Sequence, residues 1–333
     1  MQKKIIALAV AAAFSAPAFA ETTVYGIVDA AVINKSVTNL KSSMFAISGG
    51  LSGSRIGVKV TEGLDNGMTA VAVAEYKLAT DTSDGVGTAR QEMLALAGDF
   101  GTVAAGYLQT AGYDWQAKFD PLAGSAISPL QNVNAANLIG TTAVAARLPH
   151  ALAYISPDMN GLTLAANYTT NLTDALVQPA SGATTGNKVT AMMLSATYAQ
   201  GPLSAGVVYA GTASDDNGYA KTTDMAFAGS YDMGVAKLMG TFQTNKTDGG
   251  AGTNNALSLS AVAPFGPGAV VASFAKNSIA GGGGNDDSSF TAAYVYNLSK
   301  STTAYGALNQ INAKAANVAT DTTILAVGLR KKF

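Results

Sequence analysis

The residues of this chain that could do chemistry are mainly charged side chains, because the usual nucleophiles and metal ligands are scarce. The sequence contains no cysteine and one histidine, His150. The absence of cysteine excludes thiolate chemistry and disulfides, and a single histidine excludes a histidine-based metal cluster. No nucleophile motif accompanies His150, so we predict no catalytic residue, no metal site and no cofactor.

Charged residues recur at alternating positions, where they could bind and orient ions. Arg55 and Lys59 fall on one face of an extended segment, with Ile56, Val58 and Val60 on the other. Glu75 and Lys77 share a face in the same way, opposite Ala70, Ala72, Ala74 and Tyr76. A period of two is typical of a β-strand with one polar and one apolar face. The small apolar residues favour a second role for that face, contact with a neighbouring subunit.

The elements that must position these charges are therefore strands. Segments of about ten residues alternate along the chain with short turns and longer loops, the pattern of a transmembrane β-barrel. Seven short turns and eight long loops predict sixteen strands. The longest gap, about 109–146, follows the fifth predicted strand.

The first twenty residues predict export. Lys3 and Lys4 precede an apolar run, and Ala18-Phe19-Ala20 supplies the small residues of a cleavage site. We therefore assign Met1–Ala20 as a signal peptide and 21–333 as the mature domain. Without Lys3 and Lys4 the 20 basic residues fall to 18 against 21 acidic ones, a net charge of −3. This balance argues against a nucleic-acid partner, since such proteins carry a strongly basic surface.

Export and alternation together predict an all-β fold, a transmembrane antiparallel β-barrel. After residue 20 no apolar run approaches the length of about 18 residues that a membrane helix needs. In lipid a closed barrel pairs every backbone group. The charged faces, with Asp29 and Glu75 among them, must then point into a wet lumen, because a charge facing lipid costs roughly 2–4 kcal/mol. The frequent tyrosines near strand ends, Tyr25 and Tyr305 among them, favour an interfacial girdle.

Several blocks spread over the chain carry a family resemblance. They are Thr23–Ala30, Gly53–Lys59, Glu62–Gly67, Phe100–Gly106 and the terminal Val327–Phe333. In their order and spacing the chain resembles the general porins of β-proteobacteria. The resemblance implies a homotrimer of sixteen-stranded barrels in outer-membrane lipid. It also implies that Phe333 is read by the barrel-assembly machinery, and closure requires the last strand to pair with Thr23–Ile33.

The resemblance further implies that the loop at about 109–146 folds into the lumen and forms the constriction. Its only acids are Asp114 and Asp120, each of which could instead be a turn former. They would face a basic wall, for which the candidates are Arg55, Lys59, Lys77, Arg90 and Arg147. Arg90 could alternatively be an outer-rim charge. Because Tyr107, Ala153 and Ala123–Ser128 replace charged residues frequent in relatives, we expect a sparsely charged constriction with weak ion selectivity.

These expectations combine into one function. The chain is predicted to be an outer-membrane general porin, not an enzyme, that passes small hydrophilic solutes and ions by passive diffusion. A substrate-specific channel and a non-conducting structural or adhesive barrel are the alternatives. A conductance measurement distinguishes the non-conducting barrel from the two channels. Liposome swelling with sugars of graded size then distinguishes the general porin from the substrate-specific channel.

Overall fold

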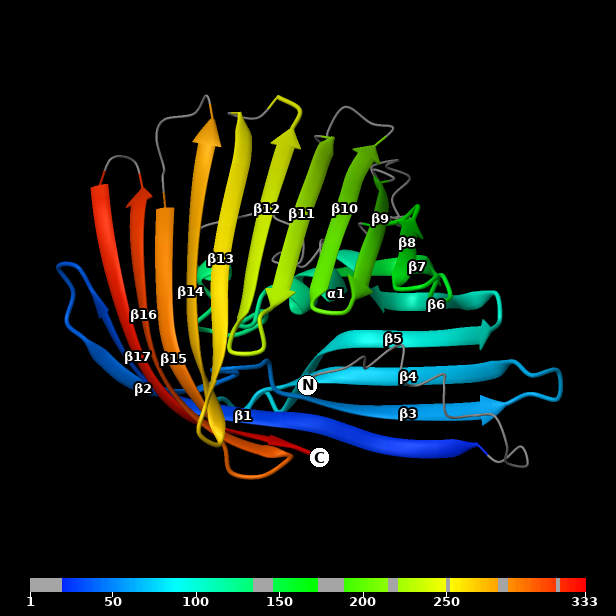
Figure 1. Ribbon diagram of the computed structural model, residues 1–333, viewed down its shortest axis with the longest axis horizontal. Coiled ribbons are helices and arrows are strands. Elements are labelled where there is room, and N and C mark those ends of the chain that lie inside the picture. The colour runs from blue at the N-terminus through cyan, green and yellow to red at the C-terminus, as the bar shows by residue number, and fades with distance from the viewer. Residues whose placement is uncertain are drawn as a thin grey trace, which may run out of the picture.

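A single antiparallel sheet that closes on itself makes up most of the structure (Figure 1). The computed structural model describes residues 20–133, 146–172, 189–214, 221–249, 252–280, 287–315 and 318–333. The predicted signal peptide, except Ala20, lies outside the described residues. No helix among the described residues is long and apolar enough to cross a membrane.

Seventeen strands form the sheet within the described residues, and successive strands pair with each other except β2 and β3, which both pair with β1. Their bounds are β1 Glu21–Val37, β2 Ser43–Ser48, β3 Arg55–Gly63, β4 Thr69–Leu78, β5 Val86–Gly98, β6 Gly101–Gln109, β7 Arg147–Ile155, β8 Leu162–Thr169, β9 Val189–Gln200, β10 Leu203–Ser214, β11 Thr222–Asp232, β12 Lys237–Thr247, β13 Thr253–Phe265, β14 Gly268–Ala280, β15 Asp287–Asn297, β16 Thr302–Ala315 and β17 Val318–Lys332.

The first and last strands close the barrel, as expected. β17 pairs antiparallel with β1 from Ile27 opposite Lys332 to Val37 opposite Thr322. Backbone hydrogen bonds continue the ladder by one more pair, with Gly26 N donating to Phe333 O (3.0 Å) and Phe333 N to Gly26 O (3.2 Å). The paired stretch of β1 therefore begins a few residues later than Thr23.

The barrel has sixteen wall positions, because β2 and β3 share one. On its other edge β1 pairs with β3 through Glu21–Ile27 and with β2 through Ala30–Lys35. Between them, residues 49–54 leave the ladder. Asp29, fully buried on β1, holds this segment by accepting hydrogen bonds from Leu51 N (3.1 Å) and Ser52 N (2.7 Å). The predicted count of sixteen is confirmed.

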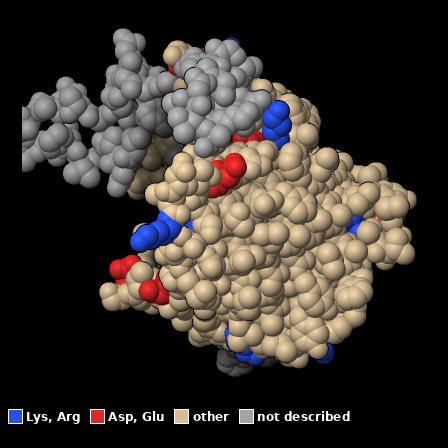
Figure 2. Space-filling model, turned by 90° about the vertical axis from the view of Figure 1, so that its left-hand side faces the viewer, with Lys and Arg blue, Asp and Glu red and all other residues tan. Residues whose placement is uncertain are grey.

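Alternation separates an apolar outside from a mixed inside. Large apolar side chains are exposed on the outer wall, among them Val24, Val32, Val58, Leu94, Leu152, Leu164, Phe227, Leu259, Leu325, Val327 and Leu329. Figure 2 shows one side as a broad uncharged surface with charged side chains toward its margins. A lipid-facing band flanked by polar rims has this appearance. Within the barrel lie the partners of the opposite parity, such as Asp29 and Ile33.

The segment after β6 turns into the barrel and contains the two helices of the described residues. Helix α1, Ala111–Phe119, begins at Thr110, whose hydroxyl accepts from Tyr113 N (3.2 Å). Helix α2, Pro129–Asn132, begins at Ser128. Figure 1 shows α1 inside the ring of strands. The Asn167 side chain on β8 accepts from Ala111 N (2.8 Å), so one orphan N–H of the first turn is satisfied by the wall.

This inward segment is fastened to opposite sides of the barrel. At its start, Trp115 and Phe119 of α1 pack on Met193, Val208 and Ala226 of the β9–β11 wall. At its far side, Thr291 of β15 donates to Ile127 O (2.6 Å), and Asn132 donates to Asn309 of β16 (3.2 Å). Leu122 and Ile127 pack with Ile33, Leu51 and Tyr305. Residues 110–133 thus span the lumen instead of lying on the outer surface.

Candidate functional site

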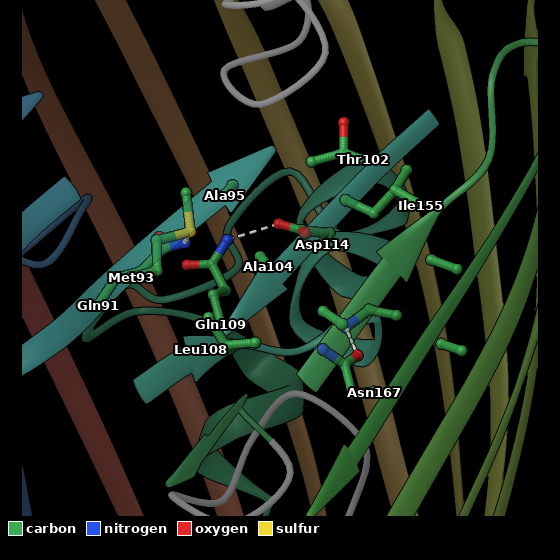
Figure 3. A pocket seen from close by; sticks show the side chains of 14 residues that line it. Gln91, Met93, Ala95, Thr102, Ala104, Leu108, Gln109, Asp114, Ile155 and Asn167 are labelled. Carbon is green, nitrogen blue, oxygen red and sulfur yellow. Dashed lines mark hydrogen bonds between the residues drawn. The ribbon is translucent and has the colours of Figure 1, made fainter. Parts of the chain in front are cut away.

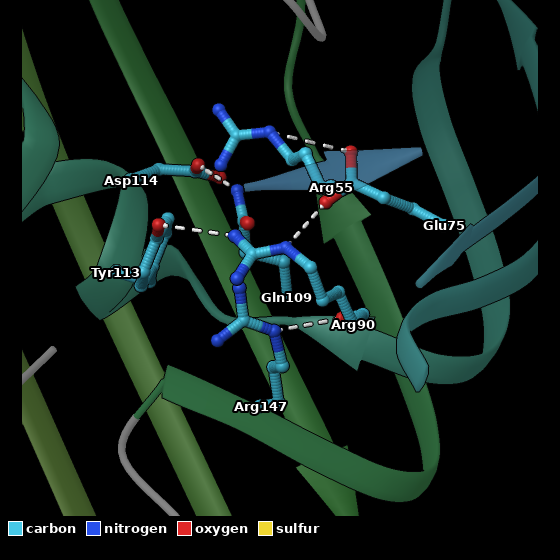
Figure 4. A network of polar contacts seen from close by, with 7 residues as sticks. All are labelled: Arg55, Glu75, Arg90, Gln109, Tyr113, Asp114 and Arg147. Carbon is cyan, nitrogen blue, oxygen red and sulfur yellow. Dashed lines mark hydrogen bonds and ion pairs between the residues drawn. The ribbon is translucent and has the colours of Figure 1, made fainter. Parts of the chain in front are cut away.

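Three arginines converge on the inner wall beside α1, and we call Arg55, Arg90 and Arg147 the arginine group (Figure 4). They come from β3, β5 and β7. Glu75 of β4 faces two of them, with Arg90 Nε 2.7 Å and Arg55 Nε 3.8 Å from its carboxylate oxygens. Arg147 Nε donates to the backbone oxygen of Arg90 (2.7 Å). Arg90 thus points inward and is not an outer-rim charge.

Tyr113 of α1 connects the inward segment to this group. Arg90 Nη2 lies 3.4 Å from the Tyr113 hydroxyl, and the Arg147 guanidinium lies over the Tyr113 ring, 4.7 Å from its centroid. Burial alone would raise the pKa of Tyr113, but the positive charges of Arg90, Arg55 and Arg147 outweigh burial and lower it. A tyrosine phenol is the partner of two cations where the resemblance led us to expect a carboxylate.

Asp114, the next residue, lies at the edge of the same group. Its carboxylate accepts from the Gln109 side chain (2.5 Å), and it is exposed to the lumen because α1 lies inside the barrel. Confinement by the surrounding protein raises the pKa of Asp114 to about 6, against the hydrogen bond from Gln109 and the charge of Arg147. The lumen charge at this position therefore changes near neutral pH.

Asp120 lies elsewhere and serves the segment's own fold. It is 4% exposed and follows α1, where its carboxylate accepts from Leu122 N (2.8 Å) and Ser128 Oγ (3.2 Å). Burial raises its pKa, opposed by these hydrogen bonds. Asp120 thus occupies the turn-former role that the sequence left open and does not join the arginine group.

The remaining predicted residues of the site are spread along the wall. Lys77 is the strand partner of Arg55 and is exposed on the same face, and half-buried Lys59 lies opposite Thr23 and Val73. Asp29 holds the segment 49–54 and is 0% exposed, so it is not open to a passing solute. Residues 134–145 of the predicted constriction loop lie outside the described part of the chain.

Four residues of the inner wall were missed by the sequence reasoning. Arg330 and Lys332 of β17 lie within electrostatic range of Arg55, and Arg330 donates to Ser52 Oγ (2.8 Å). The alternation of Leu325, Val327 and Leu329 would have placed both inward. Tyr25 approaches Glu75, and Tyr305 donates to Asp29 (2.5 Å), so neither belongs to an outer girdle. Tyr113 carried no signal in the sequence.

Positive charge therefore exceeds negative charge at this place. The arginine group is accompanied by two carboxylates, Glu75 and Asp114, and by further cations at Lys77, Arg330 and Lys332, of which Arg330 is within electrostatic range of a third carboxylate, Asp29. The expectation of a sparsely charged constriction rested on charges missing from the loop and its surroundings, whereas the structure brings Arg55, Arg90 and Arg147 of the predicted basic wall close together.

Comparison with known proteins identifies relatives over almost the whole length. A family model described as Gram-negative porin matches residues 7–316. Outer membrane porin protein 32 of Delftia acidovorans is 30% identical, an alignment covering 95% of this chain and 91% of that protein. Major outer membrane protein P.IB of Neisseria meningitidis serogroup B is also 30% identical, over 51% of this chain and 50% of its own.

Solved structures share the architecture. The anion-selective porin from Comamonas acidovorans superposes with a TM-score of 0.79 at 25% identity, covering 95% of this chain and 100% of that one. OmpF of Salmonella typhi reaches a TM-score of 0.70 at 15% identity, covering 94% and 97% of the two chains. The trimer form of OmpT from Vibrio cholerae reaches 0.68 at 14% identity over 94% and 99%. The last two show the fold alone.

Proposed function

The chain belongs to the Gram-negative porin family, and we propose that the channel it forms prefers anions. The channel is water-filled, lies in the outer membrane and passes small hydrophilic solutes and ions by passive diffusion. The observation that carries the proposal is the arginine group, of which Arg55 and Arg90 share the single carboxylate of Glu75 while Arg147 faces a phenol ring. The related structure from Comamonas, described as anion-selective, supports it.

The physical basis is the field between α1 and the wall. A narrow passage lined by low-dielectric protein concentrates the potential of its charges, so an excess of cations raises the local concentration of anions. We assign the constriction to the part of the lumen bordered by Asp114, by the arginine group and by Tyr113, which contacts Arg90 and Arg147, with Lys59 and Lys77 on the approach. No catalytic step, cofactor or energy source is part of the proposed mechanism.

The proposal is tested by the reversal potential of single channels in a potassium chloride gradient. We expect a sign that reports chloride as the more permeant ion, and a smaller potential for Arg55→Gln and Arg147→Gln. Lys300→Gln, on an exposed turn, is the matched control and should behave as wild type. A cation-selective wild-type channel would overturn the anion preference while leaving the channel assignment intact.

We further propose how the protein is delivered and assembled. Met1–Ala20 is cleaved on export, Phe333 is the terminal aromatic read by the barrel-assembly machinery, and the mature barrel is a homotrimer in outer-membrane lipid. The small outer side chains Ala70, Ala72 and Ala74 support a subunit contact on β4, since they allow close approach of another wall. Analytical ultracentrifugation of the detergent-solubilised barrel tests the trimer, and the mass of the mature chain tests cleavage before Glu21.

A further inference from the structure

A recess in the inner wall lies beside the first turn of α1 and adjoins the arginine group (Figure 3). It has a volume of about 50 Å³. Its floor is a row of directly paired residues, Ala95 of β5, Ala104 of β6 and Ala153 of β7. Since each side chain ends at Cβ, the wall is hollow along this row. The first turn of α1 covers it with Ala111 and Asp114.

The recess is unusual for a water-filled channel because most of its lining is apolar. Besides the alanine row, Met93, Leu108 and Ile155 line it, and the polar lining residues are Gln91, Thr102, Gln109, Asp114 and Asn167. Asn167 also lines the recess, and its side-chain oxygen already accepts a hydrogen bond from Ala111 N. Water entering this space finds few of the two to four hydrogen-bond partners that hold a buried water. An apolar group therefore gains by replacing it.

The recess and the arginine group share a border. The hydrogen bond between Gln109 and Asp114 belongs to both views, since these two residues line the recess and lie beside Arg147 (Figures 3 and 4). Gln109 is the strand partner of Arg147, and Gln91, at the recess, follows Arg90 in the chain. A single small solute can therefore reach the cations with one end and the alanine row with the other.

We propose that this recess is a binding subsite for organic anions that carry a short apolar group, such as aliphatic monocarboxylates. The carboxylate is held by the arginine group, whose donors suit its planar geometry, and the alkyl chain lies on the alanine row beneath α1. This inference rests on the proposed anion preference. It deepens that preference into discrimination among anions of equal charge by the size of their apolar part.

The size of the recess sets the expected selectivity. A cavity needs about 10–15 Å³ to hold one water molecule, so a recess of about 50 Å³ holds a chain of a few carbons. Each methylene that leaves water should tighten binding by about fourfold. Affinity should therefore rise from acetate through propanoate to butanoate and then level off when the recess is full.

The experiment measures partial block of the chloride current through single channels by acetate, propanoate, butanoate and pentanoate. The half-blocking concentration should fall about fourfold per methylene in wild type over the first steps. Ala104→Leu fills the recess and should abolish the dependence on chain length while keeping the potassium chloride reversal potential. Ala105→Leu, on the exposed outer face of the same strand, is the matched control and should retain wild-type behaviour.

Ala153→Val gives a milder filling if Ala104→Leu does not fold, and should reduce the dependence in the same direction. A wild-type channel that prefers chloride over potassium but responds equally to all four carboxylates would overturn this inference alone. Chain-length dependence that persists unchanged in the filled variants would do the same. A channel without anion preference would instead contradict the function on which the inference rests.

Discussion

The ring of Phe333 lies against the backbone of Gly26 at the seam where the barrel closes. A Cβ added at Gly26 would collide with Cζ of that ring and would lie 2.7 Å from the Arg55 backbone oxygen. Both residues belong to the outer face, and their backbones exchange two hydrogen bonds. The last residue of the chain therefore closes over a site that tolerates no side chain.

Gly26→Val should impair closure for this reason. We expect a lower yield of barrel that keeps its compact mobility on unheated gels after refolding into lipid. Gly229→Val is the control, because nothing lies within 4 Å of a Cβ added there. Combining Gly26→Val with Phe333→Ala should restore part of the yield, because it removes the collision with the Phe333 ring. The restoration should be incomplete because the collision with the Arg55 backbone oxygen remains. An unimpaired single variant would contradict the seam.

Removal of Phe333 should act on assembly more than on transport. Deleting it takes away one exposed ring and the terminal ladder pair, but no lumen residue. We expect much less protein in the outer membrane, with normal conductance in whatever assembles. Phe265→Ala, an exposed aromatic at the end of β13, is the control. Normal outer-membrane yield after deletion would argue against recognition of the terminal aromatic.

Anion preference should vary with pH through Asp114. Its pKa is raised to about 6, so the carboxyl is largely neutral at pH 5 and negative at pH 7. The excess of positive charge at the constriction is therefore larger at the lower pH. We expect the chloride reversal potential to increase as pH falls from 7 to 5. Asp114→Asn should show the low-pH value throughout, and an identical pH dependence in that variant would exclude Asp114 as its source.

The position of α1 should depend on Gly206. A Cβ at this residue would lie 2.7 Å from Trp115 Nε1 and 2.9 Å from Phe119 Cε2, so the helix rests directly on bare backbone. Gly206→Val should displace α1 toward the arginine group and lower conductance. Trp115, the single tryptophan and 1% exposed, reports the movement by a red shift of its fluorescence. Unchanged emission and conductance would show that α1 is not seated on Gly206.

The hydrogen bond from Tyr305 to Asp29 should contribute measurably to stability. Tyr305→Phe leaves one oxygen of a fully buried carboxylate without its donor, which costs about 1–3 kcal/mol. Urea unfolding in lipid should report the loss. Tyr296→Phe, on a half-exposed outer residue, is the control and should stay within about 0.5 kcal/mol. Equal effects of the two substitutions would rule out a special role for the pair.

The wall could be predicted from the sequence because alternation is a local property. Arg55, Lys77 and Glu75 face the lumen as their spacing indicated, and the terminal strand meets β1. The site could be predicted only in part. Tyr113 reaches Arg90 because the inward segment crosses the lumen, a tertiary outcome with no periodic signal. Asp114 and Asp120 are the same residue type, so the sequence alone does not distinguish them. The fold of the inward segment buries Asp120 in a turn and leaves Asp114 open to the lumen.

The segment 110–133 also has a mechanical consequence. One end is tied to the wall at the β9–β11 contact of Trp115, and the other is tied by hydrogen bonds to Thr291 of β15 and Asn309 of β16 and by the packing of Leu122 and Ile127 with Ile33 of β1, roughly half a barrel from β10. A segment attached to two separate regions of the wall opposes any change in the distance between them, so it resists flattening of the barrel. We therefore expect the open cross-section to stay constant when lateral pressure in the bilayer changes, so that throughput follows solute concentration and not the tension of the envelope.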